Sequence, residues 1–253
     1  MYGLLLAFAL AAGADTSVLS GDDLDKALDA AGQSAPTALE GRRFRIVLPV
    51  VSDRPQTLRN FQSSARWRYR PGQETLEIWI GLGQITAQNY DQYAKQDLGT
   101  LPPLQTLYFK TDEHRSSTVF NTSEMLREKQ EVGDRRVAVS YGLALPYAAD
   151  GTASGLPKGF LPSMVYKTRL ESRYLSPTVD GMTLEVSGVI TALGDRPNVL
   201  CGGFAGGVTA SSATGDNPIW IEDRQCFVTA RIDTALVRNK AGRVLARWGD
   251  VDR

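Results

Sequence analysis

The chain has 253 residues with 28 basic and 28 acidic side chains, so its formal net charge is zero. Nucleic-acid-binding proteins usually carry a basic surface, and this balance argues against that class of partner. Two cysteines and one histidine are too few for the four zinc ligands of a structural site made of Cys and His, and we expect no metal or other cofactor. The length is sufficient for one large domain or for two smaller domains with their own cores.

The beginning of the chain predicts export. Residues 4–10 form a short apolar run, small residues follow up to Ala14, and the chain becomes polar at Asp15. This order is typical of a secretory signal peptide, residues 1–14, cut before Asp15. The run is shorter than the about 20 apolar residues that span a bilayer. Because no Lys or Arg precedes Leu4, a buried helix or strand over residues 4–12 is the alternative. We expect a periplasmic or secreted product with no stable membrane insertion after cleavage.

Residues 15–40 form an N-terminal helical segment, whose helix begins after Ser20. Ser20 is the expected N-cap, and Asp23 takes the capping-box position three residues later. Gly32 is the residue at which the helix should end. Apolar side chains recur at helical spacing and define the face that packs on the core: Leu24, Ala27, Leu28 and Ala31.

From Phe44 the apolar pattern changes to a period of two, which predicts strands over a first β-rich half, residues 41–146. Residues 66–70 alternate strictly between arginines and aromatic side chains. Pro71 and Gly72 predict a type II turn, after which residues 75–80 return as the second arm of a hairpin. Residues 104–110 and 136–145 also predict strands, whereas residues 122–130 fit either a short helix or a strand arm.

Residues 147–162 are dense in Pro, Gly, Ala and Ser and interrupt the strand pattern, which is typical of a linker. A second β-rich half follows over residues 163–253. Its strand patterns lie at residues 164–170, 183–193, 208–210, 219–221 and 225–232. The end of the chain predicts a hairpin, in which residues 236–238 and 243–246 flank a four-residue turn that ends at Gly242.

Many short strands, close turn signals and one early helix predict a mainly β fold with antiparallel β-sandwich or barrel-like sheets. Long helices between strands are absent from the pattern, which argues against Rossmann and TIM-barrel folds. Residues 68–78 have a weak counterpart in residues 173–186, so the two β halves are either duplicated or merely similar in composition. Whether they share one core stays open.

Cys201 and Cys226 predict a disulfide, because an even cysteine count in an exported chain favours pairing. Closing a loop of this size stabilises the fold by about 3 kcal/mol in the chain-entropy model. Two free buried thiols are the alternative. The glycines within residues 202–207 lack the spacing of a phosphate-binding loop and predict a tight turn or a β-bulge.

Arg66, Arg68 and Arg70 are the candidate ligand-binding residues. In an extended strand they project from one face, while Trp67 and Tyr69 project from the other. Three guanidinium groups in a row suit a carboxylate, a phosphate or a sulfated sugar. The alternative is a solvated outer face above an aromatic core face, which antiparallel sheets commonly have.

His114 is the only histidine, so any Ser-His-Asp or Cys-His mechanism would require it. Asp112, Glu113, Ser116 and Ser117 beside it are the residue types of such a cluster, but adjacent residues of an extended chain point to opposite faces. A polar loop after a strand is the simpler interpretation. Catalytic residues therefore stay unassigned.

Glycoside hydrolysis requires only two carboxylates from different strands. Asp112, Glu113, Glu185, Glu222 and Asp223 are available, and no pattern in the sequence pairs any two of them. The preferred hypothesis is an exported, non-enzymatic β-rich protein that binds a protein partner or a small anionic or saccharide ligand. A carboxylate-dependent hydrolase acting on saccharide and a structural or assembly protein are the alternatives.

Overall fold

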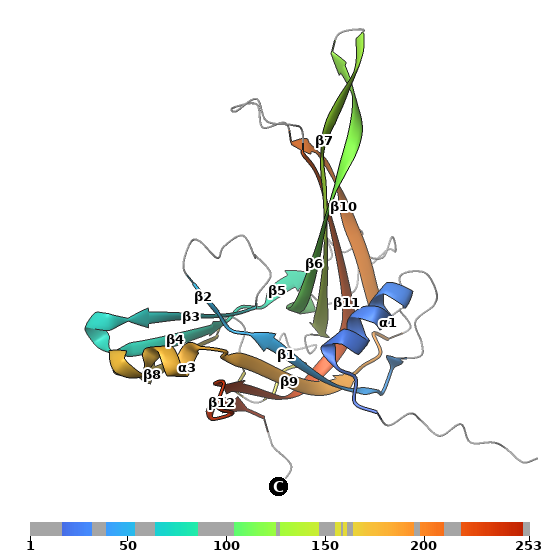
Figure 1. The fold of residues 1–253 in the computed structure, drawn as a ribbon. Coiled ribbons are helices and arrows are strands. Elements are labelled where there is room, and N and C mark those ends of the chain that lie inside the picture. Colours follow the sequence, from blue (N-terminus) through green and yellow to red (C-terminus); the bar gives the residue numbers. More distant parts are fainter. Residues whose placement is uncertain are drawn as a thin grey trace, which may run out of the picture.

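The computed structural model describes residues 17–31, 39–53, 64–85, 104–124, 127–146, 155–157, 159–160, 164–194, 198–209 and 219–249. For residues 31, 84–85, 118–124, 127–134, 164–165, 203–209 and 219–223 the structure describes the backbone only. The expected signal peptide and most of the linker-like segment lie outside these ranges. The described strands form two open sheets and no closed barrel (Figure 1), which confirms the predicted mainly β class.

Helix α1 (Gly21–Ala31) begins at the predicted N-cap. The Asp23 N–H donates to Ser20 Oγ at 3.2 Å, and the Ser20 N–H donates to the Asp23 carboxylate at 2.9 Å. The Ser20 hydroxyl also donates to the Asp23 carboxylate at 2.7 Å, and this bond, together with that from the Ser20 N–H, lowers the pKa of Asp23; the capping box is confirmed. Leu24 and Leu28 are fully buried and Ala27 packs against the core, as predicted, and the side chain of Ala31 lies outside the described part. Among the described residues, no helix has the length and apolar character to cross a membrane.

The larger sheet has eight strands. Its main path runs β1-β9-β11-β7-β6-β5, and β10 and β12 also pair with β11. Every neighbouring pair is antiparallel except β7 and β11, which run parallel because the chain crosses over through the second half before it returns as β11. The strands are β1 (Arg43–Pro49), β5 (Gly83–Ile85), β6 (Leu104–Glu124), β7 (Arg127–Pro146), β9 (Thr183–Ile190), β10 (Val199–Thr209), β11 (Ile219–Arg238) and β12 (Val244–Trp248).

Strand β11 is 20 residues long and changes partners part-way along its length. Residues 219–229 pair with β7, and residues 219–228 with β10, whereas residues 230–238 pair with β9 and residues 235–238 with β12. At the junction, the Thr229 N–H donates to the Asn198 carbonyl at 2.8 Å and its carbonyl accepts from the Thr191 N–H at 3.0 Å. Strands β9 and β10 therefore follow each other along one edge of β11.

The smaller sheet has the strand order β2-β3-β4-β8. Its strands are β2 (Val51–Ser52), β3 (Ala65–Arg70), β4 (Thr75–Ile80) and β8 (Met164–Arg169), with a 3-10 turn η3 (Pro71–Gln73) between β3 and β4. A second 3-10 turn, η4 (Ser172–Tyr174), and the short helix α3 (Leu175–Val179) follow β8. Both sheets contain strands from before and after residues 147–162, so the two β-rich halves share their sheets.

One large cluster of buried side chains joins the two sheets and α1. It contains Phe44 and Ile46 from β1, Ile78 from β4, Leu143 from β7 and other buried residues of β9 and β11. The alternation of buried and exposed residues along β1 and β9 follows the period-two pattern of the sequence. The two halves therefore have one core in common, and burial of its apolar area is the main stabilising contribution.

The larger sheet continues beyond this core as a projection that we call the blade: residues 111–124, 127–137, 202–209 and 219–225. Figure 1 shows the β6–β7 hairpin (green) rising from the body beside β10 and β11. Strand β6 alone has 21 residues, which corresponds to about 70 Å of extended chain. Residues 122–124 and 127–130 belong to the two arms of this hairpin, so for these residues the strand alternative is correct and the helix alternative is wrong.

The turn between β3 and β4 differs from the sequence prediction, whereas the C-terminal hairpin agrees with it. Residues 71–73 form a 3-10 turn, and Glu74 rather than Gly72 adopts the positive φ, at 45°. The Glu74 N–H donates to the Pro71 carbonyl at 3.2 Å, which closes the turn one residue later than a type II turn would. The C-terminal hairpin forms as predicted, with Gly242 at φ +80°.

The weak sequence repeat between residues 68–78 and 173–186 does not correspond to a structural repeat. Residues 68–70 are part of β3, whereas their counterparts near residue 174 form η4 and α3. The second segment therefore has a helical turn where the first has a strand, and composition alone explains the resemblance.

We predict that Gly188→Ala destabilises the protein by about 3 kcal/mol, because overpacked cores force the backbone to shift. A Cβ at Gly188 would lie 1.9 Å from the Arg231 carbonyl oxygen, where β9 passes β11 beside a register shift. Gly72→Ala is the matched control, since a Cβ there meets nothing within 4 Å. Urea unfolding at neutral pH measures both variants. Equal midpoints would contradict the close approach of the two strands.

Candidate functional site

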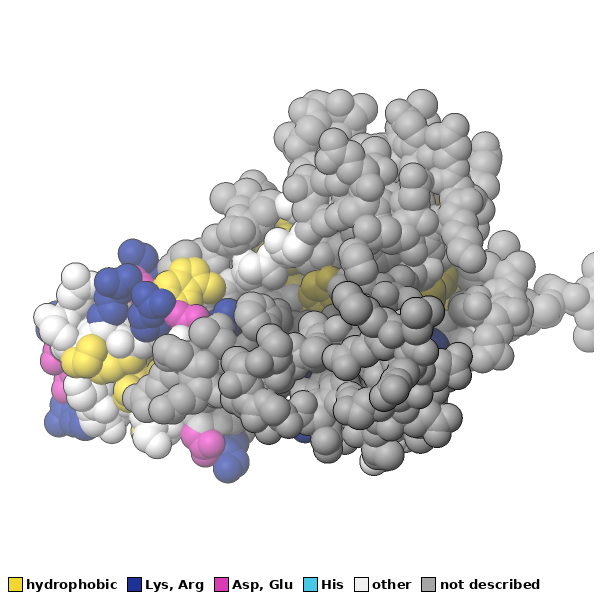
Figure 2. Space-filling model, turned by 90° about the horizontal axis from the view of Figure 1, so that it is seen from above, with side chains coloured by type: hydrophobic (Ala, Val, Ile, Leu, Met, Phe, Trp, Pro, Cys, Tyr) yellow, Lys and Arg dark blue, Asp and Glu magenta, His cyan; other side chains and the backbone are white. Residues whose placement is uncertain are grey.

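The arginine face lies on the smaller sheet, on the side of β3 away from the core. Arg66, Arg68 and Arg70 alternate along β3 with Trp67 and Tyr69, which pack against the core cluster. Strand β4 places Trp79 opposite Arg66 and Glu77 opposite Arg68, so these side chains share the arginine face. Figure 2 shows Lys and Arg side chains gathered at this end of the molecule, with acidic and apolar side chains among them.

Each arginine of this face contacts a carboxylate of the same sheet. Arg68 is ion-paired and hydrogen-bonded to Asp53, whose other oxygen lies 3.9 Å from Arg66. Arg70 Nε lies 2.9 Å from Glu77 Oε2. The structure thus brings the three predicted residues together on one face, and each of them has a carboxylate within 4 Å. The three guanidinium groups therefore do not form the free row that an anion site requires.

Glu77 is the least exposed member of this network, with 2 % of its surface accessible. Besides Arg70, it contacts Lys167 of β8, whose Nζ lies 3.3 Å from Glu77 Oε1. The contact with Arg70, and to a smaller extent that with Lys167, lowers the pKa of Glu77 below 4.5 although burial opposes this shift. Glu77 is therefore an ionised partner of two cations and is poorly suited to the role of a proton donor.

Trp79 is half-buried beside the arginines, and its ring is already covered on one side. The guanidinium carbon of Arg68 lies 4.6 Å from the centroid of the Trp79 ring. This cation–π contact covers one face of the Trp79 ring. The arginine face is consequently built as a cross-strand network that stabilises the smaller sheet.

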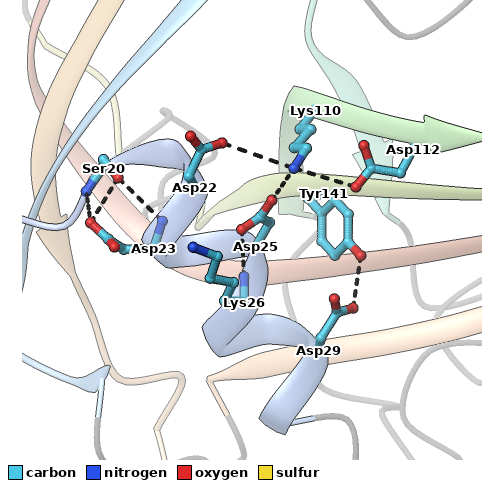
Figure 3. Close-up of polar contacts among 9 residues, drawn as sticks. All are labelled: Ser20, Asp22, Asp23, Asp25, Lys26, Asp29, Lys110, Asp112 and Tyr141. Atoms are coloured by element: carbon cyan, nitrogen blue, oxygen red, sulfur yellow. Dashed lines mark hydrogen bonds and ion pairs between the residues drawn. The ribbon is translucent and has the colours of Figure 1, made fainter.

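A second polar cluster, which the sequence did not predict, lies where α1 meets β6 and β7 (Figure 3). Asp25, which is 4 % exposed, is ion-paired with Lys110 of β6, and Lys110 Nζ also lies 3.3 Å from Asp112. On the next turn of α1, Asp29 accepts a hydrogen bond of 2.7 Å from the Tyr141 hydroxyl of β7. Burial and this hydrogen bond together raise the pKa of Tyr141 well above its usual value.

These contacts attach α1 to the base of the blade. The hydrogen bond from Lys110 to Asp25 is the main reason that the pKa of Lys110 is raised, so the ammonium stays charged. The sequence carried a usable signal, because Asp22, Asp25 and Asp29 recur at helical spacing beside the apolar stripe. Among the described residues, no group of three or more His, Cys, Asp or Glu side chains is arranged to bind a metal ion.

The candidate catalytic residues lie in separate contacts. Glu113 is bound by Arg115 and Arg136, each at 2.7 Å, and these contacts lower its pKa. Glu185 lies on β9, 2.9 Å from Arg45 of β1. Asp112 contacts Lys110, whose Nζ occupies the space between Asp112 and Asp25 (Figure 3). The side chains of residues 222 and 223 lie outside the description.

His114 lies inside β6, so the prediction of a polar loop at this position is wrong. The reason is the length of the β6–β7 hairpin, which continues well past the apolar part of the strand. Residues 113–117 are all exposed, although neighbours in a strand point to opposite faces. Both faces of β6 are therefore open to solvent here, in contrast to residues 104–107, which are buried.

The predicted disulfide is present. Cys201 of β10 and Cys226 of β11 are directly opposite each other, with their Cα atoms 4.1 Å apart, and their sulfur atoms are bonded. The bond joins the two strands where the blade leaves the core. The β-bulge prediction for the glycines is also confirmed, because the β10–β11 register shifts between Ala205 and Val208.

Comparison with protein-family models, with curated proteins and with solved structures finds no match to this chain.

We predict that Glu77→Gln lowers the free energy of unfolding by about 1–2 kcal/mol at neutral pH, because Arg70 and Lys167 lose their shared carboxylate. Since the folded-state pKa of Glu77 is depressed, its contribution is present above 4.5 and is lost as the pH falls through the folded-state pKa. Urea unfolding between about pH 7 and about pH 3.5 should show the wild-type advantage shrinking with acid.

The control for this prediction is Glu171→Gln, which removes a carboxylate from an exposed pair with Arg173. It should change the unfolding free energy by less than about 0.5 kcal/mol. An advantage of the wild type over Glu77→Gln that stays constant down to acid pH would contradict the assigned role of Glu77.

Proposed function

We propose that this chain is an exported β-rich protein that binds a macromolecular partner through its blade, in the periplasm or outside the cell. The observation that supports it is the exposure of residues 113–117 on both faces of β6. A protein gains little stability from extending a sheet beyond its own core, because both faces of that extension stay in water. Binding of a partner by the blade accounts for such an extension of the sheet.

Charge and hydrogen bonding favour a macromolecule over a small ligand. Of the described polar side chains in this part of β6, Glu113 and Arg115 are charged, and His114, Ser116 and Ser117 are polar. Exposed polar side chains on an extended strand suit recognition by strand addition, in which backbone hydrogen bonds supply affinity and side chains supply specificity.

Export is supported by two features that are independent of each other. The Cys201–Cys226 disulfide is of a kind that forms and persists in oxidising compartments. The apolar run and small residues before Asp15 have the order of a signal peptide.

We expect the protein recovered from the organism that makes it to begin at Asp15, because a signal peptidase cuts after small residues. N-terminal sequencing together with the intact mass of protein from the envelope or the medium measures this. A chain recovered from the cytoplasm with residues 1–14 still attached would contradict export.

We expect a photo-crosslinking amino acid at Ser117 to give adducts heavier than the monomer in the producing cells, because this position is exposed on the blade. The matched control is Gln73 in the η3 turn, which is exposed on the smaller sheet away from the blade. Denaturing gels after irradiation compare the two. Equal adduct yields from both positions, or none from either, would contradict the blade as the contact surface.

A further inference from the structure

Among the described residues, the outer edge of β6 is paired along only a small part of its length. Strand β7 pairs with one edge of β6 over residues 104–124, and β5 pairs with the other edge only over residues 104–106. Within the described residues no further strand lies on that second edge. The edge therefore continues along the exposed run of residues 113–117, where neither face of the strand is covered by the core.

A second copy of the same strand can add to this edge in only some registers. In an antiparallel pair, directly opposed residues point to the same face of the sheet. A two-fold axis perpendicular to the sheet keeps each side chain on the same face of the sheet in both copies. Adjacent residues of a strand point to opposite faces, so a residue of one copy cannot lie directly opposite its sequence neighbour in the other copy. The axis must therefore pass beside a residue that faces its own copy. We call the residue that faces its own copy the centre. Choosing one residue of the exposed run as the centre fixes all the remaining residue pairs between the two strands.

Charge selects one of these centres. When His114 faces its own copy, Glu113 lies opposite Arg115 of the partner subunit, and Arg115 lies opposite Glu113 of the partner subunit. When the centre is Glu113 or Arg115, that charge faces the same charge of the other copy, which destabilises a strand pair. Centres at Ser116 or Ser117 give no pair between Glu113 and Arg115. The register around His114 is thus the self-complementary one within residues 113–117.

We propose that a second copy of this chain pairs antiparallel along the outer edge of β6, centred on His114, so that the blades of two molecules form one continuous sheet. This inference rests on the proposed function, since it names the partner of the blade. Backbone hydrogen bonds between the two β6 strands supply the affinity. Glu113 and Arg115, now 2.7 Å apart within one chain, also pair across the interface and specify the register.

The first experiment uses the absence of free cysteines, since both native cysteines are in the disulfide. His114→Cys places a thiol opposite its own copy at the distance of directly opposed strand residues, about 5 Å between Cα atoms. Mild oxidation should convert this variant to a covalent dimer. Ser116→Cys is the matched control, because it is equally exposed and its two copies lie about 13 Å apart along the paired strands.

The second experiment exchanges charges. Glu113→Arg and Arg115→Glu each place like charges opposite each other, so each should weaken self-association about tenfold in sedimentation-velocity measurements. An equimolar mixture of the two variants should recover it, because each Arg then faces a Glu of the other chain. Glu171→Arg and Arg173→Glu exchange the charges of an exposed pair outside the blade, and neither should change association. Circular dichroism checks that all four variants remain folded.

The outcomes separate this inference from the proposed function. A monomer at all concentrations, or a disulfide that forms equally from Cys at 114 and at 116, overturns pairing around His114. If these tests fail but Ser117 crosslinks to a different protein in cells, partner binding by the blade is supported and a second copy of the chain is excluded as that partner. A dimer that is unaffected by either charge variant also overturns the proposal, because the contact then lies elsewhere on the molecule.

Discussion

The hydrogen-bonding of β11 is the constraint on which the rest of the structure depends. One half of this strand lies between β7 and β10 in the blade, and the other half lies between β9 and β12 in the body. Because a continuous strand cannot bend freely while both edges are paired, the blade projects in a direction set by the body. The Cys201–Cys226 disulfide reinforces this strand where it leaves the core. The position of the exposed part of β6 follows from these contacts.

Charge pairing has different consequences in the two parts of the molecule. In the smaller sheet it is local and partly buried, as in the contacts of Glu77 with Arg70 and Lys167. Beneath α1, Asp25 and Lys110 form the contact that attaches the helix to the base of the blade. On the blade, the charges of Glu113 and Arg136 lie at the surface, where water competes with each ion pair. Surface charges of this kind contribute little stability and are therefore available for recognition.

Sheet edges explain why a projecting blade needs a partner or a defence. An unpaired edge is a template for association, and proteins limit this hazard with charges and short edge strands. Strand β6 is long, and Glu113 and Arg115 place opposite charges on either side of His114. These charges do not prevent pairing at the edge, but they favour a partner strand with complementary charges. A homomeric contact of this kind is isologous, so it ends at two copies and does not propagate. The export that we propose would place this contact in an oxidising compartment, where disulfides persist.

Residue pattern and composition were enough to predict five features: the mainly β class, the capped helix after Ser20, the C-terminal hairpin, the disulfide and the alternation of Arg66, Arg68 and Arg70 with aromatic residues. All of these depend on neighbours in the chain or on residue chemistry, which periodicity and composition report. Three other features became known from the folded chain: the arginines contact Asp53 and Glu77, Asp25 contacts Lys110, and His114 lies in a strand. These depend on strand register and on pairings between residues far apart in the chain, and a single sequence contains no local signal for such contacts.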